Sequence, residues 1–175
     1  TIIIGIDPGF SGAIAKLSSK GTLEIWDMPI VADRKGRSVL NLYELHELFS
    51  PKAKEDYVAV LEQVASRPGQ SAPATFRFGQ GYGVLEMGLA AHKIEKKTVT
   101  PAKWKKYFGL SKNKGASRGL AIERFPQYAS LFKRVKDDGR AEAALLALAF
   151  FLSWSLAIAS AIASSSALRV LMTAA

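Results

Sequence analysis

The stretch that decides the fold is residues 2–9, Ile-Ile-Ile-Gly-Ile-Asp-Pro-Gly. Four isoleucines within five residues are typical of a fully buried strand, and Pro8–Gly9 is a turn pair that ends it. Residues 10–17 are again mostly apolar, so the two segments predict a hairpin with Asp7 at its mouth. A carboxylate there is costly unless a cation or a strong donor compensates it. Alternatively, Asp7 only caps the turn through its own backbone.

Length and composition place the chain among folded domains. Its 175 residues suit one domain with a core of its own, and an apolar content of 49% excludes a disordered chain. The chain contains no cysteine, which excludes disulfides and thiolate zinc sites. Since residues 2–7 are expected to form a strand and not a signal peptide, we expect a cytoplasmic protein.

Positive charge is concentrated in one segment. The formal net charge is +9, and residues 93–118 contain nine Lys and Arg against one acid, Glu95. Such a local excess is typical of a polyanion-binding surface, although a solvated helix face gives the same pattern. Trp104, Tyr107 and Phe108 lie inside the segment and favour a docking surface.

The remaining elements follow from periodicity and turn signals. We expect strands over 22–28, 56–64 and 97–101, helices over 40–49, 84–91, 101–108, 117–125 and from 136, and loops over 30–38 and 66–73. Thr100 is a suitable cap for the helix that begins at Pro101. The glycines at positions 79, 81, 83 and 88 favour close helix packing or close approach of a DNA backbone over a phosphate loop, because no strand directly precedes them.

Two strands end on an acid, and the last helix begins with acids. Glu62 ends the strand over 56–64, as Asp7 ends the first strand. Asp138 and Glu142 are four residues apart and share one helix face. Asp137 is better placed as a cap favoured by the helix dipole, although the register between Asp137 and Asp138 stays open.

Convergence of these elements brings four carboxylates to one small volume, where they cannot all stay ionised without cations. Hard oxygen ligands of this kind suit Mg²⁺ or Mn²⁺. Two such ions clamp the in-line attack of water on a phosphodiester. Together with the basic segment, the acids predict a nuclease.

In their order and spacing these motifs resemble the RuvC-type Holliday junction resolvases of the RNase H-like superfamily, nearest the phage and plastid branch. The matching segments are residues 5–9 (Gly-Ile-Asp-Pro-Gly), 60–64 (Val-Leu-Glu-Gln-Val), 137–143 (Asp-Asp-Gly-Arg-Ala-Glu-Ala), 100–106 and 114–118. The resemblance implies an α/β protein with an RNase H-like fold: a mixed five-stranded sheet with helices on both faces. The nuclease domain would span residues 1–150.

The same resemblance implies a homodimeric crossover junction endodeoxyribonuclease that resolves Holliday junctions and other branched DNA by paired symmetric nicks. It implies two Mg²⁺ ions per active site, with Mn²⁺ as a substitute, and a location at the nucleoid, or in the host cytoplasm if the protein is phage-encoded. The implied metal ligands are Asp7, Glu62, Asp138 and Glu142, and Lys114 is the implied catalytic cation beside the scissile phosphate. The implied DNA-binding residues are Lys103, Lys105, Lys106, Lys112, Lys114, Ser117, Arg118, Phe76 and Phe78.

Three features depart from the family pattern. The last acidic pair is spaced i, i+4, where bacterial resolvases use i, i+3. The aromatic wedge that follows the second acid in bacterial members is absent, since Ala65 stands there, and Phe76 and Phe78 are the candidates to replace it. From Ala143 to Leu168 there is no charged residue.

The uncharged segment is long enough to span a bilayer, but it begins inside the catalytic helix and is diluted by Ala and Ser. We therefore expect residues 151–175 to form an apolar helical tail, packed on the same domain or on the dimer partner and not in a membrane. Two functional alternatives stay open. One is an actin- or hexokinase-like ATPase, which needs two such domains, and the other is a branched-DNA-binding module without cleavage.

Overall fold

The computed structural model describes residues 1–52, 55–66, 69–111, 113 and 115–173, with side chains as far as residue 160 except residue 158. The strands are β1 (Ile2–Asp7), β2 (Ala13–Ser18), β3 (Leu23–Asp27), β4 (Ile30–Ala32), β5 (Ser38–Leu40), β6 (Tyr57–Glu62) and β7 (Glu95–Val99). The α-helices are α1 (Leu42–Phe49), α2 (Ala72–Ala91), α3 (Pro101–Tyr107), α4 (Ala116–Arg124) and α5 (Asp138–Thr173). Two 3-10 turns, η1 (Pro126–Phe132) and η2 (Val135–Asp137), lie between α4 and α5.

The central sheet has five strands in the order β3-β2-β1-β6-β7. β1 pairs antiparallel with β2, which confirms the expected hairpin, and parallel with β6, which pairs parallel with β7. β7 lies at one edge and begins two residues before the strand expected over 97–101. Because β1 and β6 are adjacent and parallel, their carboxyl ends, and with them Asp7 and Glu62, meet at the same edge of the sheet.

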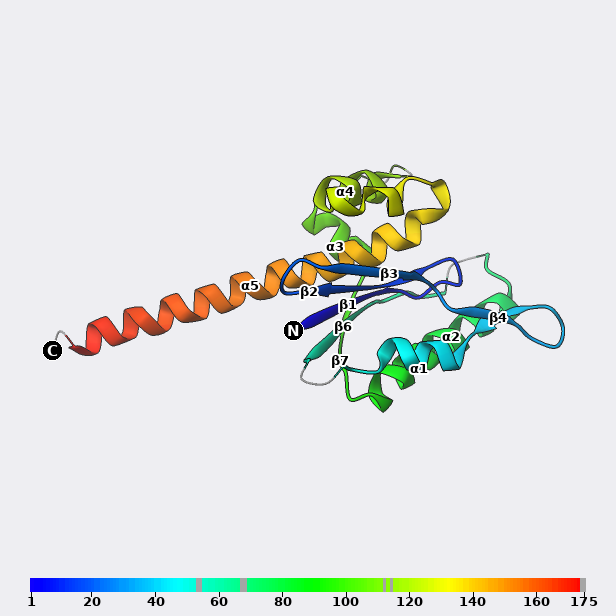
Figure 1. The fold of residues 1–175 in the computed structure, drawn as a ribbon, viewed down its shortest axis with the longest axis horizontal. Coiled ribbons are helices and arrows are strands. Elements are labelled where there is room, and N and C mark those ends of the chain that lie inside the picture. Colours follow the sequence, from blue (N-terminus) through cyan, green and yellow to red (C-terminus); the bar gives the residue numbers. More distant parts are fainter. Residues whose placement is uncertain (53–54, 67–68, 112, 114, 174–175) are drawn as a thin grey trace.

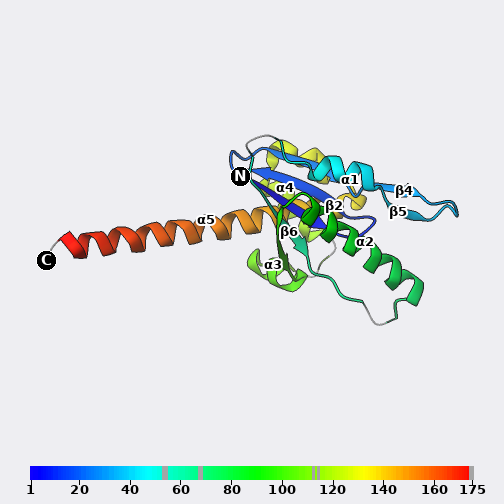
Figure 2. The same ribbon diagram turned by 90° about the horizontal axis from the view of Figure 1, so that it is seen from below.

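Helices cover both faces of the sheet, as expected for the RNase H-like fold (Figure 1). α1 and α2 lie on one face, and α3, α4 and the first half of α5 lie on the other (Figures 1 and 2). Each face of the sheet has its own apolar core, and β1 contributes side chains to both. Ile3 packs toward α5, whereas Ile4 and Ile6 pack toward α1 and α2. Both faces of this strand are therefore buried, which explains its continuous apolar run.

The β1–α5 contact depends on an absent side chain. A Cβ on Gly5 would lie 2.0 Å from the carbonyl oxygen of Ala143 and 2.8 Å from the nitrogen of Ala147. The helix therefore approaches the strand more closely than any other residue at position 5 permits, with the small Ala143 and Ala147 facing it. This close approach places the first turns of α5 at the edge where Asp7 and Glu62 lie.

The expected loop over 30–38 is wrong. Residues 30–40 form a hairpin, in which Ile30 pairs with Leu40 and Ala32 with Ser38. Its tip is closed by Asp33, whose carboxylate accepts hydrogen bonds from the backbone N–H groups of Lys35 and Arg37. Local turn chemistry of this kind outweighs the polar composition that indicated a loop.

Helix α2 begins at Ala72, well before the expected start at residue 84. The Ser71 side chain accepts from the backbone N–H of Ala74, and a proline lies in the first turn, so the helix has an ordinary cap at its observed start. The glycine-containing stretch is thus helical and is not a phosphate loop. Gly88 confirms the expected close packing, because a Cβ there would lie 3.0 Å from the Phe49 ring. The expectation is wrong at Gly79 and Gly83, where a Cβ would have no atom within 4 Å.

Helix α5 runs from Asp138 to Thr173, and its two halves differ. The first half is buried from Ala141 to Ala147. The second half extends away from the domain (Figure 1), and the described side chains from Ser153 onward are exposed. Packing of the tail on its own domain is therefore not what the structure has. Within the described residues, one span, Val135–Ala157, is long and apolar enough to cross a membrane by length and composition, and a third of it is buried in the fold.

Candidate active site

Asp7 is the first acid at the sheet edge, and its surroundings disfavour its charge. Burial raises its pKa, and the nearby carboxylates of Glu62 and Glu142 raise it further, to about 7. The Gly9 backbone N–H and the Lys105 ammonium act in the opposite direction but do not compensate. The expected convergence of acids from β1, β6 and α5 is thus visible in their electrostatic interaction.

Glu62 is buried at the end of β6, with 5% of its surface exposed. Its Oε1 accepts a hydrogen bond from the indole Nε1 of Trp104 at 2.8 Å. Trp104 itself is 2% exposed, so it belongs to the core and not to the docking surface that the sequence indicated. Helical periodicity could have predicted this burial, because Trp104 lies three residues after Pro101 and four before Phe108, which places the three residues on one helix face.

The start of α5 is held against the sheet by two residues of the Asp-Gly-Arg-Ala-Glu motif. A Cβ on Gly139 would lie 2.6 Å from the carbonyl oxygen of Ser11, so only glycine lets this turn of the helix reach the β1–β2 turn. Arg140 forms two hydrogen bonds of 2.6 Å each with the carboxylate of Asp27 at the end of β3. Neither role could be predicted from the motif itself, because each depends on a segment distant in the sequence.

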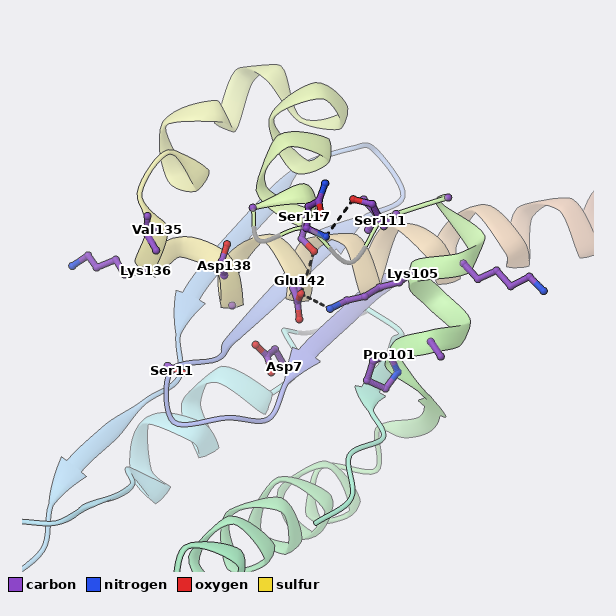
Figure 3. Close-up of a pocket in the computed structure, with 17 residues that line it drawn as sticks. Asp7, Ser11, Pro101, Lys105, Ser111, Ser117, Val135, Lys136, Asp138 and Glu142 are labelled. Atoms are coloured by element: carbon purple, nitrogen blue, oxygen red, sulfur yellow. Dashed lines mark hydrogen bonds and ion pairs between the residues drawn. The ribbon is translucent and has the colours of Figure 1, made fainter. Parts of the chain in front are cut away.

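Glu142 faces Asp7 across the site (Figure 3). Its Oε1 accepts from Lys105 Nζ at 2.7 Å and from Ser117 Oγ at 3.1 Å. Lys105 and Ser117 were expected to contact DNA, and here both contact a candidate metal ligand. The cation of α3 therefore neutralises one of the carboxylates.

Asp138 and Asp137 point to different partners. Asp138 lies beside the site, where Arg118 Nε donates to its Oδ1 at 2.6 Å. Asp137 is 1% exposed, and its carboxylate accepts from the backbone N–H of Arg134 at 2.8 Å and from the Arg134 guanidinium. These hydrogen bonds lower the pKa of Asp137. Asp137 thus accepts from a backbone N–H, as expected of a cap, although that N–H belongs to Arg134 at the start of η2. The role of Asp138 as a metal ligand stays a prediction.

A pocket of about 1230 Å³ opens over these residues. Asp7, Asp138 and Glu142 lie in its wall, together with Lys105 and Lys106 of α3 (Figure 3). Ammonium groups and carboxylates thus line the same pocket.

A smaller pocket of about 350 Å³ adjoins the same acids from the α2 side. Asp7, Glu62 and Glu142 line it together with Phe78. Of the two wedge candidates, Phe78 is thus next to the carboxylates, whereas Phe76 projects from α2 with 67% of its surface exposed.

The remaining predicted contacts lie further away or outside the described residues. Lys103 lines an apolar groove between β7, α3 and α5. Lys112 and Lys114 lie outside the residues that the structure describes, so their expected roles in DNA binding, and that of Lys114 in catalysis, stay predictions.

The donor set fits a hard divalent cation. In the described part of the chain, no three acidic, histidine or cysteine side chains are arranged to hold a metal ion as they stand, and ammonium and guanidinium groups pair with Glu142 and Asp138. Even so, burial together with the neighbouring carboxylates of Glu62 and Glu142 raises the pKa of Asp7 to about 7. A divalent ion relieves such repulsion, and carboxylate oxygens are the ligands that Mg²⁺ prefers. Asp7, Glu62 and Glu142, with Asp138 beside them, are the residues that would hold it.

Comparisons with known proteins agree at the level of structure. No family model and no curated protein matches the sequence. RuvC of Thermus thermophilus, in complex with a Holliday junction substrate, is similar with a TM-score of 0.52 and 12% identity, over 85% of this chain and 91% of that chain. Another T. thermophilus RuvC structure gives a TM-score of 0.50 and 15% identity, over 87% of this chain and 96% of that chain.

At such identities the likeness establishes the fold. The chain is an α/β protein with an RNase H-like fold, which confirms the fold expected from residues 2–9 and the later motifs. The particular version of that fold is the one found in RuvC.

Proposed function

We propose that this protein is a structure-selective endodeoxyribonuclease that resolves four-way or otherwise branched DNA by Mg²⁺-dependent phosphodiester hydrolysis. The observation that carries the proposal is the meeting of Asp7, Glu62 and Glu142, from three distant elements, beside a pocket that lysines also line. Support for the substrate comes from the likeness to a RuvC structure that contains a Holliday junction.

Each part of the site has a role in this chemistry. Two Mg²⁺ ions, held by Asp7, Glu62, Asp138 and Glu142, would activate water and stabilise the leaving oxygen. The lysines of α3 attract the phosphate backbone to the pocket. Binding of the ions requires Lys105 and Arg118 to release Glu142 and Asp138, and a DNA phosphate is a suitable new partner for either cation.

Paired symmetric nicks need two active sites, and we propose that the active form is a homodimer. Trp154 and Leu156 of α5 are exposed, and their burial against a second copy of the chain would be favourable. Light scattering at micromolar concentration measures this directly. A protein that is monomeric both free and on a four-way junction would contradict paired cleavage by one dimer.

The decisive experiment incubates the protein with an end-labelled four-way junction, a fork and a linear duplex, each with Mg²⁺ or EDTA. We expect symmetric nicks in the junction with Mg²⁺, little cleavage of the duplex, and none in EDTA. Glu62→Gln is the matched control, because glutamine keeps an oxygen for the Trp104 N–H while it removes the charge. The proposal fails if no branched substrate is cleaved with Mg²⁺ or Mn²⁺, or if Glu62→Gln cleaves at the wild-type rate.

A further inference from the structure

The indole of Trp104 contacts the second carboxylate of the site, and we propose that Trp104 is a positioning residue that holds Glu62 oriented for a divalent cation. The inference rests on the proposed function, because it concerns how one carboxylate of that site is kept ready for metal. It adds a residue that touches neither metal nor DNA but that metal binding requires.

The sheet determines where Trp104 lies. Glu62 stands opposite Val99 in the parallel β6–β7 pair, and the backbone N–H of Gln63 donates to the Val99 carbonyl at 2.8 Å. Thr100 follows at once and caps α3 through its side chain. Trp104 is one helical turn beyond that cap, so the turn brings its ring back toward the end of β6. The connection from β6 to Trp104 is therefore short and held by hydrogen bonds, which restricts the position of the indole.

Burial makes the contact strong for both partners. Trp104 and Glu62 are 2% and 5% exposed, and water is therefore a poor substitute for either partner. A buried indole N–H needs an acceptor, and a buried carboxylate needs donors. The Nε1–Oε1 distance of 2.8 Å is in the range of charge-assisted hydrogen bonds, which are about twice as strong as neutral ones.

The type of donor matters for a metal ligand. An indole N–H carries no charge, so it orients the Glu62 carboxylate and leaves its negative charge for a cation. Lys105, the next residue, neutralises the carboxylate that it contacts, Glu142. Hydrogen-bond partners of ligating groups that fix orientation without removing charge typically contribute 10–100-fold to metal affinity.

The Trp104 ring also contacts the ammonium group of Lys105. The Lys105 Nζ lies 5.1 Å from the centre of the Trp104 ring, in the range of a cation–π contact. One side chain thus orients Glu62 through its edge and supports the ammonium on Glu142 through its face.

The test replaces the N–H donor and measures metal binding apart from catalysis. Mn²⁺ binding to the DNA-free protein is followed by electron paramagnetic resonance, and the Mg²⁺ midpoint of junction cleavage is measured in parallel. The variants are Trp104→Phe and the wild-type chain with benzothienylalanine at position 104, which keeps the bicyclic ring and lacks only the N–H. Trp26→Phe, on β3, is the matched control for loss of a tryptophan.

We expect Mn²⁺ affinity to fall 10–100-fold in both Trp104 variants and the Mg²⁺ midpoint to rise by the same factor, with junction binding in EDTA and the Trp26→Phe values unchanged. Benzothienylalanine keeps the test valid if Trp104→Phe unfolds. In a Glu62→Gln background, the same replacement should add no further loss of Mn²⁺ affinity, because the group being oriented is no longer a charged ligand. A purely structural role would instead give equal losses in both backgrounds.

Two results are distinguishable as failures. A wild-type protein that neither binds Mn²⁺ nor cleaves any branched DNA would overturn the proposed function, and this inference with it. A wild-type protein that does both, combined with a benzothienylalanine variant within twofold of it in Mn²⁺ affinity, would overturn the role of Trp104 alone.

Discussion

Replacement of Asp7 by asparagine should stabilise the metal-free protein at pH 8 while it abolishes cleavage. Burial and the charges of Glu62 and Glu142 raise the pKa of Asp7 from 3.8 to about 7 in the fold. Between these two values the folded protein holds a proton that the unfolded chain has lost. The free energy of unfolding therefore falls as the pH rises through this window and stays low above it.

The magnitude follows from the pKa change. Since one pKa unit corresponds to about 1.4 kcal/mol, the rise to about 7 corresponds to a penalty of about 4 kcal/mol above neutral pH. Asparagine removes the charge and still offers an oxygen to the Gly9 N–H. We therefore expect a gain of about 2–4 kcal/mol at pH 8, or roughly 4–16 °C in Tm for a chain of this size.

Thermal unfolding of wild type and Asp7→Asn, measured at pH 5 and pH 8 in EDTA, checks this expectation. The variant should be the more stable protein at pH 8, and its advantage should be about 2–3 kcal/mol smaller at pH 5, where the folded wild type is protonated while the unfolded chain is already ionised. Mg²⁺ at pH 8 should raise the Tm of wild type more than that of the variant, and Asp56→Asn, exposed before β6, serves as the control. An equal Tm difference between wild type and Asp7→Asn at the two pH values would refute the raised pKa of Asp7.

Three further predictions concern the packing of α5, the acidic pair and DNA binding. Gly5→Ala should cost at least about 1–3 kcal/mol in denaturant unfolding, because its Cβ would meet the backbone of α5 at 2.0 Å. Gly79→Ala, with nothing within 4 Å, should instead gain up to about 1 kcal/mol, and equal effects of the two changes would contradict the close approach. Asp138→Asn should abolish cleavage and keep the fold, whereas Asp137→Asn should cost about 1–3 kcal/mol through the buried Arg134 contacts and keep most activity; the reverse pattern would move the register by one residue. Junction affinity should fall steeply with salt, and Lys106→Ala should lower the slope of log affinity against log salt by about 1, while an unchanged slope would place the DNA elsewhere.

The sequence by itself determined the elements whose signals are local. The isoleucines of residues 2–6, the turn after Asp7 and the Thr100 cap each act over a few residues, and the structure has them where they were expected. The order of the acids along the chain also predicted that β1, β6 and α5 bring carboxylates to one edge. Where the local signal was missed or outweighed, as at the Ser71 cap and in the hairpin of residues 30–40, the expected element was wrong.

Only the tertiary structure decided which groups contact the acids. Lys105, Arg118 and Trp104 all lie in or beside the basic segment, and composition gave no reason to separate a core indole from a surface one, or a carboxylate-bound cation from a DNA-binding one. These contacts join residues 20 to 42 positions apart. They form because β6 pairs in parallel with β7, and because Gly5 and Gly139 permit the close approach of α5 to the sheet. No short-range pattern in a sequence encodes such contacts between distant segments.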